Sequence, residues 1–250
     1  MKRNAFNMAD KMRLDMLLVA RGLAESREWA QRLIRAGEVR VNGQVVLQPA
    51  QRVDTDAQLE IEQPPKYVSR GGYKLEAALA HFGVNPSGLV CADVGSSTGG
   101  FTDCLLQHGA ARVYAIDAGT HQLHWRLRNN PRVVLMERTN ARYLDALPEP
   151  IDLATVDVSF ISLTLILPQV FKWLREPSGR VIALIKPQFE AGREQVGKGG
   201  VVRDPQVHHA VIEALRAFVA RHGWHMQAVI PSPILGADGN QEFLAFITKP

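Results

Sequence analysis

Short apolar runs alternate with amphipathic stretches along most of the chain, from about residue 73 to its end. Two of these runs, Val90–Val94 and Arg112–Ile116, are followed by a glycine-rich or acidic turn, and the runs Leu153–Val156 and Val181–Ile185 look similar. Helical patterns lie between the runs, and strands that alternate with helices indicate βαβ units and a parallel sheet. The pattern therefore predicts an α/β fold, with a Rossmann-like sheet and helices on both faces.

Four charged residues fall at one edge of this predicted sheet. Asp157 and Lys186 directly follow apolar runs, so they lie at the carboxyl ends of parallel strands, where ligands bind in such sheets. Glu242 precedes the last apolar run, which suits the second strand of an antiparallel hairpin that returns to the same edge. Lys74 opens the helix before the first strand, and the start of that helix should lie at the same edge. We therefore expect the four side chains to meet.

A different pattern fills the N-terminal part of the chain. Arg13–Arg21 and Ser26–Ala36 read as two short helices, and Ser26 is a plausible N-cap of the second. The dipeptide Asn42-Gly43 between valine-rich segments is typical of a tight β-hairpin. Val53–Ile61 predicts one further strand. These elements indicate a small α+β domain.

The boundaries of these segments follow from composition. Gln63–Gly72 reads as a linker, because its two prolines resist helix and sheet and its two glycines free the other end. A semi-rigid strut and a hinge that responds to RNA are both compatible with it. We assign residues 1–11 to a flexible tail, 12–62 to the small domain, 63–72 to the linker and 73–250 to the α/β domain.

Length and charge narrow the class of protein. The chain has 250 residues, of which 46% are hydrophobic, enough for one large and one small domain. The net charge of +4 and the pI of about 9.2 permit a polyanionic partner without requiring one. Lys and Arg outnumber Asp and Glu within residues 1–40, so the small domain is the more basic part.

Basic residues recur in the small domain and the linker at spacings that place several on one face. Two segments resemble the S4 type of RNA-binding domain. One begins at Arg13-Leu-Asp-Met, and the other runs from Ser26 to the hairpin at Val41-Asn-Gly43. The resemblance favours RNA binding over a merely solvated charged face. The RNA-binding candidates are Lys11, Arg13, Arg27, Arg32, Arg35, Arg40, Lys66 and Arg70.

A glycine-rich turn, Gly95-Ser-Ser-Thr-Gly-Gly100, lies between the first predicted strand and a helix. It lacks the lysine of a P-loop and the spacing of a dinucleotide-binding turn, so ATP and NAD are less favoured. Asp117 follows Asp93 at the spacing at which an acid binds ribose hydroxyls. S-adenosylmethionine is the best candidate cofactor, with Asn140 beside the adenine. The predicted cofactor-binding residues are Asp93, Gly95, Ser96, Ser97, Thr98, Gly99, Gly100, Phe101, Asp117, Asn140 and Asp157.

Two lysines and two carboxylates beside such a cofactor suit methyl transfer to a hydroxyl. A ribose 2′-hydroxyl is a poor nucleophile until its proton is removed, and a free lysine is protonated at neutral pH. A second cation and partial burial would let a lysine act as the base. We therefore assign the base to Lys186, its electrostatic neighbour to Lys74, and the orienting roles to Asp157 and Glu242. The alternative is four ordinary ion pairs.

Six stretches carry a further resemblance: Ser69-Arg-Gly-Gly-Tyr-Lys-Leu, Asp93-Val-Gly-Ser-Ser-Thr-Gly-Gly-Phe-Thr-Asp, Thr155-Val-Asp-Val-Ser-Phe-Ile-Ser, Ile185-Lys-Pro-Gln-Phe-Glu, Gly197-Lys-Gly-Gly-Val-Val-Arg-Asp and Ser232-Pro-Ile-Leu-Gly-Ala-Asp-Gly-Asn-Gln-Glu-Phe. Together they are similar to the TlyA family of 2′-O-ribose rRNA methyltransferases, within the FtsJ/RrmJ-like superfamily. The resemblance covers nearly the whole chain. It implies a Lys-Asp-Lys-Glu tetrad at Lys74, Asp157, Lys186 and Glu242, S-adenosylmethionine as cofactor, and a cytidine of 16S or 23S rRNA in ribosomal subunits as substrate.

The remaining observations bear on alternatives. Cys91 and Cys104 form no motif, so we expect neither a disulfide nor a metal site. No signal peptide or membrane span is evident, which favours a cytoplasmic monomer. Relatives carry a haemolysin label, yet no long amphipathic membrane segment is present. A catalytically idle RNA-binding assembly factor stays open as the second hypothesis, and a haemolysin as the third.

Overall fold

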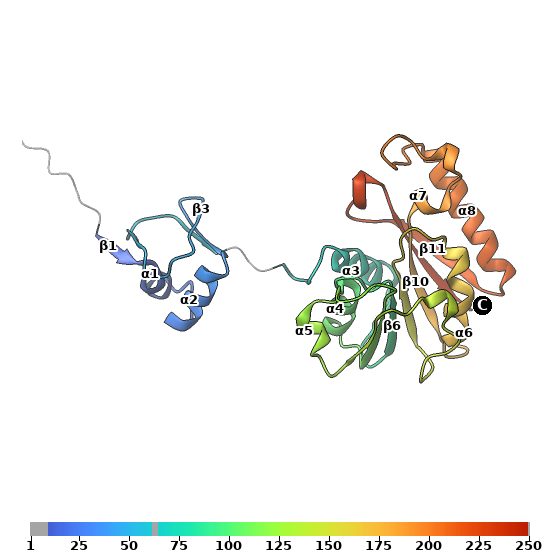
Figure 1. Ribbon diagram of the computed structural model, residues 1–250, viewed down its shortest axis with the longest axis horizontal. Helices are drawn as coiled ribbons and strands as arrows, with labels where there is room; N and C mark the ends of the chain where they lie inside the picture. The colour runs from blue at the N-terminus through green and yellow to red at the C-terminus, as the bar shows by residue number, and fades with distance from the viewer. Residues whose placement is uncertain (1–9, 62–64, 250) are drawn as a thin grey trace, which may run out of the picture. The chain divides into compact units, whose positions relative to one another are not determined.

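The computed structural model describes residues 10–61 and 65–249, and it divides into two compact units between Lys66 and Tyr67. Each unit is described by itself (Figure 1). Most of the predicted tail, residues 1–9, and residues 63–64 of the predicted linker lie outside the described residues.

Within residues 10–61, the small unit contains two helices and five short strands. They are β1 (Lys11–Arg13), α1 (Leu14–Ala20), α2 (Arg27–Arg35), β2 (Val39–Val41), β3 (Gln44–Val45), β4 (Arg52–Asp54) and β5 (Leu59–Ile61). The side chain of Ser26 caps α2 by accepting a hydrogen bond from the backbone N–H of Trp29 at 3.2 Å. Asn42 and Gly43 both have positive φ angles, as the predicted hairpin requires.

The prediction of a single strand over Val53–Ile61 is wrong. The backbone N–H of Ala57 bonds back to the carbonyl of Asp54, and this turn separates β4 from β5. The two strands join different sheets, because β4 pairs with β1 whereas β5 pairs with β2. Lys11, which the sequence places at the end of the tail, lies in β1.

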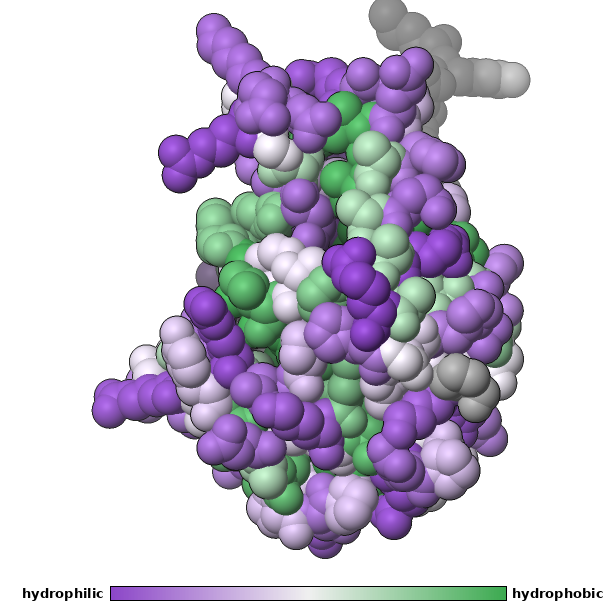
Figure 2. Space-filling view, turned by 90° about the vertical axis from the view of Figure 1, so that its right-hand side faces the viewer, coloured by the Kyte–Doolittle hydropathy of each residue, from purple (hydrophilic) through white to green (hydrophobic). Residues whose placement is uncertain are grey.

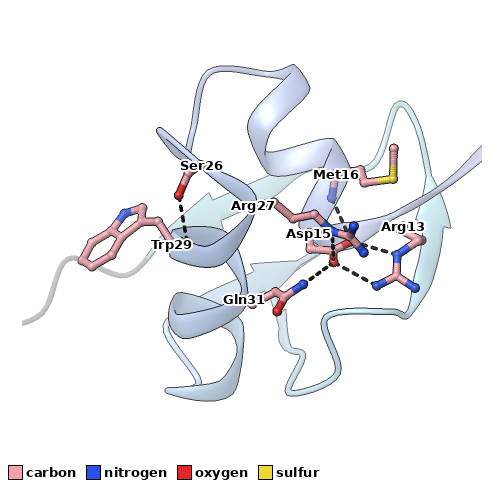
Figure 3. A network of polar contacts seen from close by, with 7 residues as sticks. All are labelled: Arg13, Asp15, Met16, Ser26, Arg27, Trp29 and Gln31. Atoms are coloured by element: carbon pink, nitrogen blue, oxygen red, sulfur yellow. Dashed lines mark hydrogen bonds and ion pairs between the residues drawn. The ribbon is translucent and has the colours of Figure 1, made fainter.

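A buried carboxylate organises the surface of the small unit (Figure 3). Asp15 is fully buried and accepts hydrogen bonds from Arg13 at 3.1 and 2.9 Å, from Arg27 at 3.0 Å and from Gln31 at 3.0 Å. The hydrogen bonds from Arg13 make the largest contribution to lowering the pKa of Asp15 well below its usual range. Asp15 thereby holds Arg13 of β1 and Arg27 of α2 beside the same carboxylate.

The large unit is built on a seven-stranded sheet with the order β11-β12-β10-β9-β6-β7-β8. Its strands are β6 (Val90–Val94), β7 (Arg112–Ile116), β8 (Val133–Met136), β9 (Leu153–Val156), β10 (Arg180–Ile185), β11 (His225–Pro231) and β12 (Phe243–Thr248). The five strands β6 to β10 are parallel, and β12 runs antiparallel to both β10 and β11. The predicted parallel sheet and its antiparallel C-terminal hairpin are confirmed.

Helices cover both faces of the sheet, as predicted (Figure 1). The helices are α3 (Gly71–Phe82), α4 (Gly100–Gln107), α5 (Trp125–Arg128), α6 (Leu167–Trp173), α7 (Pro187–Glu190) and α8 (Pro205–Arg221), with 3₁₀ turns η1 (Ala141–Tyr143), η2 (Leu163–Leu165), η3 (Arg193–Gln195) and η4 (Ala237–Gly239). One apolar core contains residues of α3 and α4, and a second contains residues of α6 and α8. Cys91 and Cys104 are buried and form no disulfide with each other.

The segment between Tyr67 and Gly72 belongs to the large unit, although the sequence assigns it to the linker. The Tyr67 side chain is buried against Gly72, where a Cβ would lie 2.2 Å from the ring. The backbone N–H of Val68 also donates to Asp103 of α4 at 2.9 Å. These contacts fix the start of α3 beside α4.

Candidate functional site

The four predicted catalytic residues lie at one edge of the large sheet. Asp157 directly follows β9, and Lys186 directly follows β10. Glu242 directly precedes β12, whose first residue pairs with the last residue of β10. Lys74 lies in the first half of α3. The structure therefore places all four where the sequence predicts them, and their roles stay a prediction.

The four side chains form two ion pairs. The Lys186 ammonium lies 2.6 Å from Asp157 Oδ1 and donates a hydrogen bond to the Ser159 hydroxyl at 2.8 Å. The Lys74 ammonium lies 2.5 Å from Glu242 Oε2. The second pair is the deeper one, because the Glu242 side chain is only 3% exposed. The first pair is more accessible, with the Asp157 side chain 22% exposed.

Glycines let the backbone approach these carboxylates closely. A Cβ on Gly95 would lie 2.2 Å from the carbonyl oxygen of Asp157, and Gly95 has a φ angle of +83°. A Cβ on Gly236 would lie 2.0 Å from Glu242 Oε1. Gly99 packs instead against Leu123 and Leu127. A side chain at Gly95 or Gly236 would therefore displace Asp157 or Glu242.

Asp93 does not reach the pocket, although the sequence suggests that it binds the cofactor. Its side chain is fully buried and accepts hydrogen bonds from the hydroxyls of Thr102 at 2.6 Å and Thr155 at 3.3 Å. Burial raises the pKa of Asp93 to about 7. The residue therefore braces β6 against α4 and β9, beneath the glycine-rich turn.

Asp117 holds the glycine-rich turn from its other side. Its Oδ2 accepts a hydrogen bond from the backbone N–H of Ser97, and its Oδ1 accepts one from Gly119, both at 2.7 Å. Asn140 lies across the same cavity and caps η1, accepting from the backbone N–H of Arg142 at 3.0 Å. The two residues frame one end of a pocket.

Two adjoining cavities open at this edge. One, of about 250 Å³, is lined by Lys74 and the glycine-rich turn, and one of about 450 Å³ is lined by Asp117 and Asn140. Gly95, Ser97 and Asp157 line both. Of the predicted cofactor residues, Asp93 and Gly99 line neither. Further wall residues were not predicted from the sequence: Ser69, Gly71, Gln122, Thr139, Val158, Ser159 and Phe160. Several of them lie beside the predicted motifs, and this proximity in sequence could have identified them.

The donor set fits an adenosyl cofactor. Ser96 Oγ is buried at the smaller cavity and has no hydrogen-bond partner among residues 10–61 and 65–249. A buried hydroxyl without a partner is costly, so a polar ligand group beside it would be stabilised. The carboxylate of Asp117 suits two ribose hydroxyls, and the larger cavity has the apolar walls Val158 and Ile161.

The predicted RNA-binding residues of the small unit have different surroundings. Arg13 and Arg27 are held by Asp15, and Lys11 lies 4.0 Å from Asp54. The Arg32 guanidinium stacks over the exposed Trp29 ring at 4.8 Å from its centroid, and Arg35 is exposed on the same helix. The Arg40 side chain donates to the carbonyl of Gly43 at 3.4 Å.

The last two predicted RNA contacts lie at the boundary of the units. Lys66 is exposed and is the last residue of the small unit, whereas Arg70 lines the smaller cavity of the large unit. Of the predicted RNA contacts, Arg70 is therefore the one that belongs to the large unit, and it lies at the candidate site.

Among residues 10–61 and 65–249, no helix combines the length and hydropathy that a membrane span needs. On the face drawn in Figure 2, hydrophilic side chains surround smaller groups of apolar ones.

Comparisons with known proteins cover both units. The model of the FtsJ-like methyltransferase family matches residues 67–249, and that of the S4 domain matches residues 12–59. The chain is 52% identical over 247 residues to YqxC of Bacillus subtilis (strain 168), whose name gives rRNA methyltransferase as a provisional function; the match covers 96% of this chain and 86% of YqxC.

Two further relatives are similar over most of their length. The 16S/23S rRNA (cytidine-2′-O)-methyltransferase TlyA of Mycobacterium tuberculosis (strain CDC 1551 / Oshkosh) is 44% identical over 244 residues, which cover 96% of this chain and 91% of that protein. A solved structure from Streptococcus thermophilus, described provisionally as a hemolysin, is 45% identical with a TM-score of 0.73 and covers 96% of this chain and 89% of that one.

Proposed function

The chain belongs to the FtsJ-like methyltransferase family and carries an S4 domain before its catalytic domain, and we propose that it methylates ribose 2′-hydroxyls of ribosomal RNA. S-adenosylmethionine is the cofactor. The observation that carries the proposal is the Lys186–Asp157 pair, whose carboxylate residue lines both cavities, together with the buried Lys74–Glu242 pair. The names of the relatives favour a cytidine of 16S or 23S rRNA as the target, and a cytoplasmic monomer is the simplest state for such an enzyme.

The residues of the site divide the work between binding and chemistry. Asp117 and Asn140 would hold the adenosine part of the cofactor, and Ser96 with the glycine-rich turn would hold its amino-acid part. When bound, S-adenosylmethionine supplies a methyl group on a positively charged sulfur. After its ammonium has released one proton to solvent, Lys186 accepts the proton of the 2′-hydroxyl through the freed lone pair; Asp157 orients the lysine, and the Lys74–Glu242 pair fixes the far wall of the smaller cavity.

Methylation of ribosomal subunits tests this function. Subunits from a strain that lacks the gene are incubated with the purified protein and radiolabelled S-adenosylmethionine, and 2′-O-methylated riboses are then mapped. We expect label at a discrete cytidine of one or both subunits. Bound cofactor without any label in RNA would instead support an RNA-binding assembly factor that is catalytically idle.

Replacing Asp117 by alanine should weaken cofactor binding. The variant loses the acceptor for the ribose hydroxyls and the support of Ser97, and hydrogen bonds to a charged group contribute about 1.5–3 kcal/mol, equivalent to about 10- to 100-fold in affinity. Calorimetry with S-adenosylmethionine measures the change. Asp145→Ala, which removes an exposed acid of the same unit, is the control and should bind like wild type. Equal affinity in all three proteins would refute the ribose assignment.

Reversing charge on α2 should weaken RNA binding selectively. Arg32→Glu/Arg35→Glu removes two exposed cations, and each lost phosphate contact flattens the slope of log K against log salt by about 0.7–0.9. Cofactor affinity should be unchanged. Arg52→Glu in β4 changes charge outside the predicted set and serves as the control. RNA affinity that is unaffected at low salt would show that these arginines form a solvated face only.

A further inference from the structure

We infer that Glu190 is a positioning residue for methyl transfer: its carboxylate ties the loop after Asp157 to the helix after Lys186, and so keeps the two side chains in one arrangement. The inference rests on the proposed function. It uses the last residue of the Ile185-Lys-Pro-Gln-Phe-Glu motif, for which the cofactor and the proton transfer provide no role.

The contacts of Glu190 join two segments that are distant in sequence. Glu190 ends α7, the short helix directly after Lys186. Its Oε1 accepts a hydrogen bond from the backbone N–H of Leu163 at 2.7 Å, and its Oε2 accepts one from the Ser162 hydroxyl at 2.6 Å. Asp157 stands at the near end of the loop 158–162, and Glu190 therefore holds its far end.

A carboxylate in this position needs its two donors. Glu190 is partly buried, and burial raises its pKa, whereas the hydrogen bonds from Leu163 and Ser162 oppose the increase. Removing a carboxylate from water is unfavourable unless hydrogen bonds replace the lost hydration. The loop and the carboxylate consequently stabilise each other.

The loop adopts a conformation that requires such support. Phe160, in its middle, has a φ angle of +63°, which is unfavourable for a bulky residue and persists only where the surroundings impose it. The Phe160 ring is 90% exposed and contacts Phe189 of α7, with the ring centroids 5.0 Å apart. This aromatic contact lies at the surface, whereas the hydrogen bonds of Glu190 are partly buried. The hydrogen bonds are therefore the contacts that hold the loop in place.

Asp157 and the loop that follows it supply the two partners of the predicted base. Lys186 pairs with Asp157 at 2.6 Å and donates to Ser159 at 2.8 Å. Residues 158–161 also line the larger cavity. If the far end of the loop is released, Ser159 can shift relative to Lys186, and the base loses its fixed orientation toward the cofactor pocket.

Replacing Glu190 by alanine tests the inference through kcat. We expect kcat for rRNA methylation to fall by up to about 10²-fold, the loss that a misplacement of about 1 Å can cause, while RNA affinity stays at the wild-type value. Ser162→Ala and Glu190→Gln each weaken only one of the two hydrogen bonds and should lower kcat less. If thermal unfolding shows that the Glu190→Ala variant is not folded, these two variants test the inference in its place.

A double-mutant cycle separates positioning from a general structural role. Because Glu190 acts through the loop that carries Ser159, Glu190→Ala should reduce kcat less in the Ser159→Ala background than in wild type. Glu194→Ala, which removes an exposed acid four residues further on, is the control and should leave kcat unchanged.

Two results would overturn the inference: a wild-type kcat in the Glu190 and Ser162 variants, or the same fold-loss in both backgrounds of the cycle. Failure of the proposed function is distinguishable, since the wild-type protein would then place no methyl group on rRNA.

Discussion

Replacing Lys186 by alanine is expected to reduce methyl transfer by about 10²–10⁴-fold, the contribution of a typical general base. Affinity for S-adenosylmethionine and for rRNA should remain near wild type, because Lys186 lines neither cavity and lies outside the small unit. Single-turnover kinetics with saturating cofactor measure the chemical step directly. Lys172→Ala in α6 removes an exposed lysine outside the site and should leave the rate unchanged.

A second substitution distinguishes proton removal from charge alone. Lys186→Arg keeps a cation beside Asp157, but an arginine stays protonated in proteins and cannot accept the 2′-proton. We expect this variant to be as slow as the alanine variant. If methyl transfer requires only proximity, with the proton leaving late to water, both variants would keep rates within a few-fold of wild type, and the base assignment would be wrong.

The position of the site could be predicted because it follows from chain order. Asp157 and Lys186 directly follow buried apolar runs, and the carboxyl ends of parallel strands meet at one edge. Glu242 reaches that edge because the last strand runs antiparallel to its neighbours. None of these inferences needs the direction of a side chain, and this is why they hold.

The pairing within the site could be predicted only in part. The hypothesis gave Lys186 the neighbours Lys74 and Asp157; the structure pairs the ammonium of Lys186 with Asp157, and it pairs that of Lys74 with Glu242, which the hypothesis did not include. Which carboxylate meets which lysine depends on the rotamers of long side chains and on the space left by Gly236. The periodicity of apolar residues in the sequence determines neither these rotamers nor the space beside Gly236.

Side-chain direction also explains the other differences. Successive residues of a strand point to opposite faces of the sheet, so Asp93 near the end of β6 points into the protein, although it adjoins the glycine-rich turn. Phe160 was missed for another reason. Its positive φ angle is unusual for an aromatic residue, and its ring contacts Phe189 of α7, which is distant in sequence.

Replacing Glu242 by alanine should produce the largest loss of stability among the site variants. It leaves the ammonium of Lys74 without its carboxylate at a side chain that is only 11% exposed. Removing one partner of a buried ion pair typically costs about 3–5 kcal/mol, because the remaining charge is neither hydrated nor paired. Urea denaturation monitored by fluorescence would measure the free energy of unfolding.

The double variant Lys74→Met/Glu242→Leu separates the stabilising role of this pair from its role in methylation. Apolar residues of similar volume often replace a buried ion pair without loss of stability, so the double variant should unfold at a higher urea concentration than Glu242→Ala. Its methylation should nevertheless stay far below wild type, since the charged wall of the smaller cavity is gone. If the double variant regained both stability and methylation, the Lys74–Glu242 pair would be a structural element alone, and only Lys186 and Asp157 would remain as candidates for the chemistry.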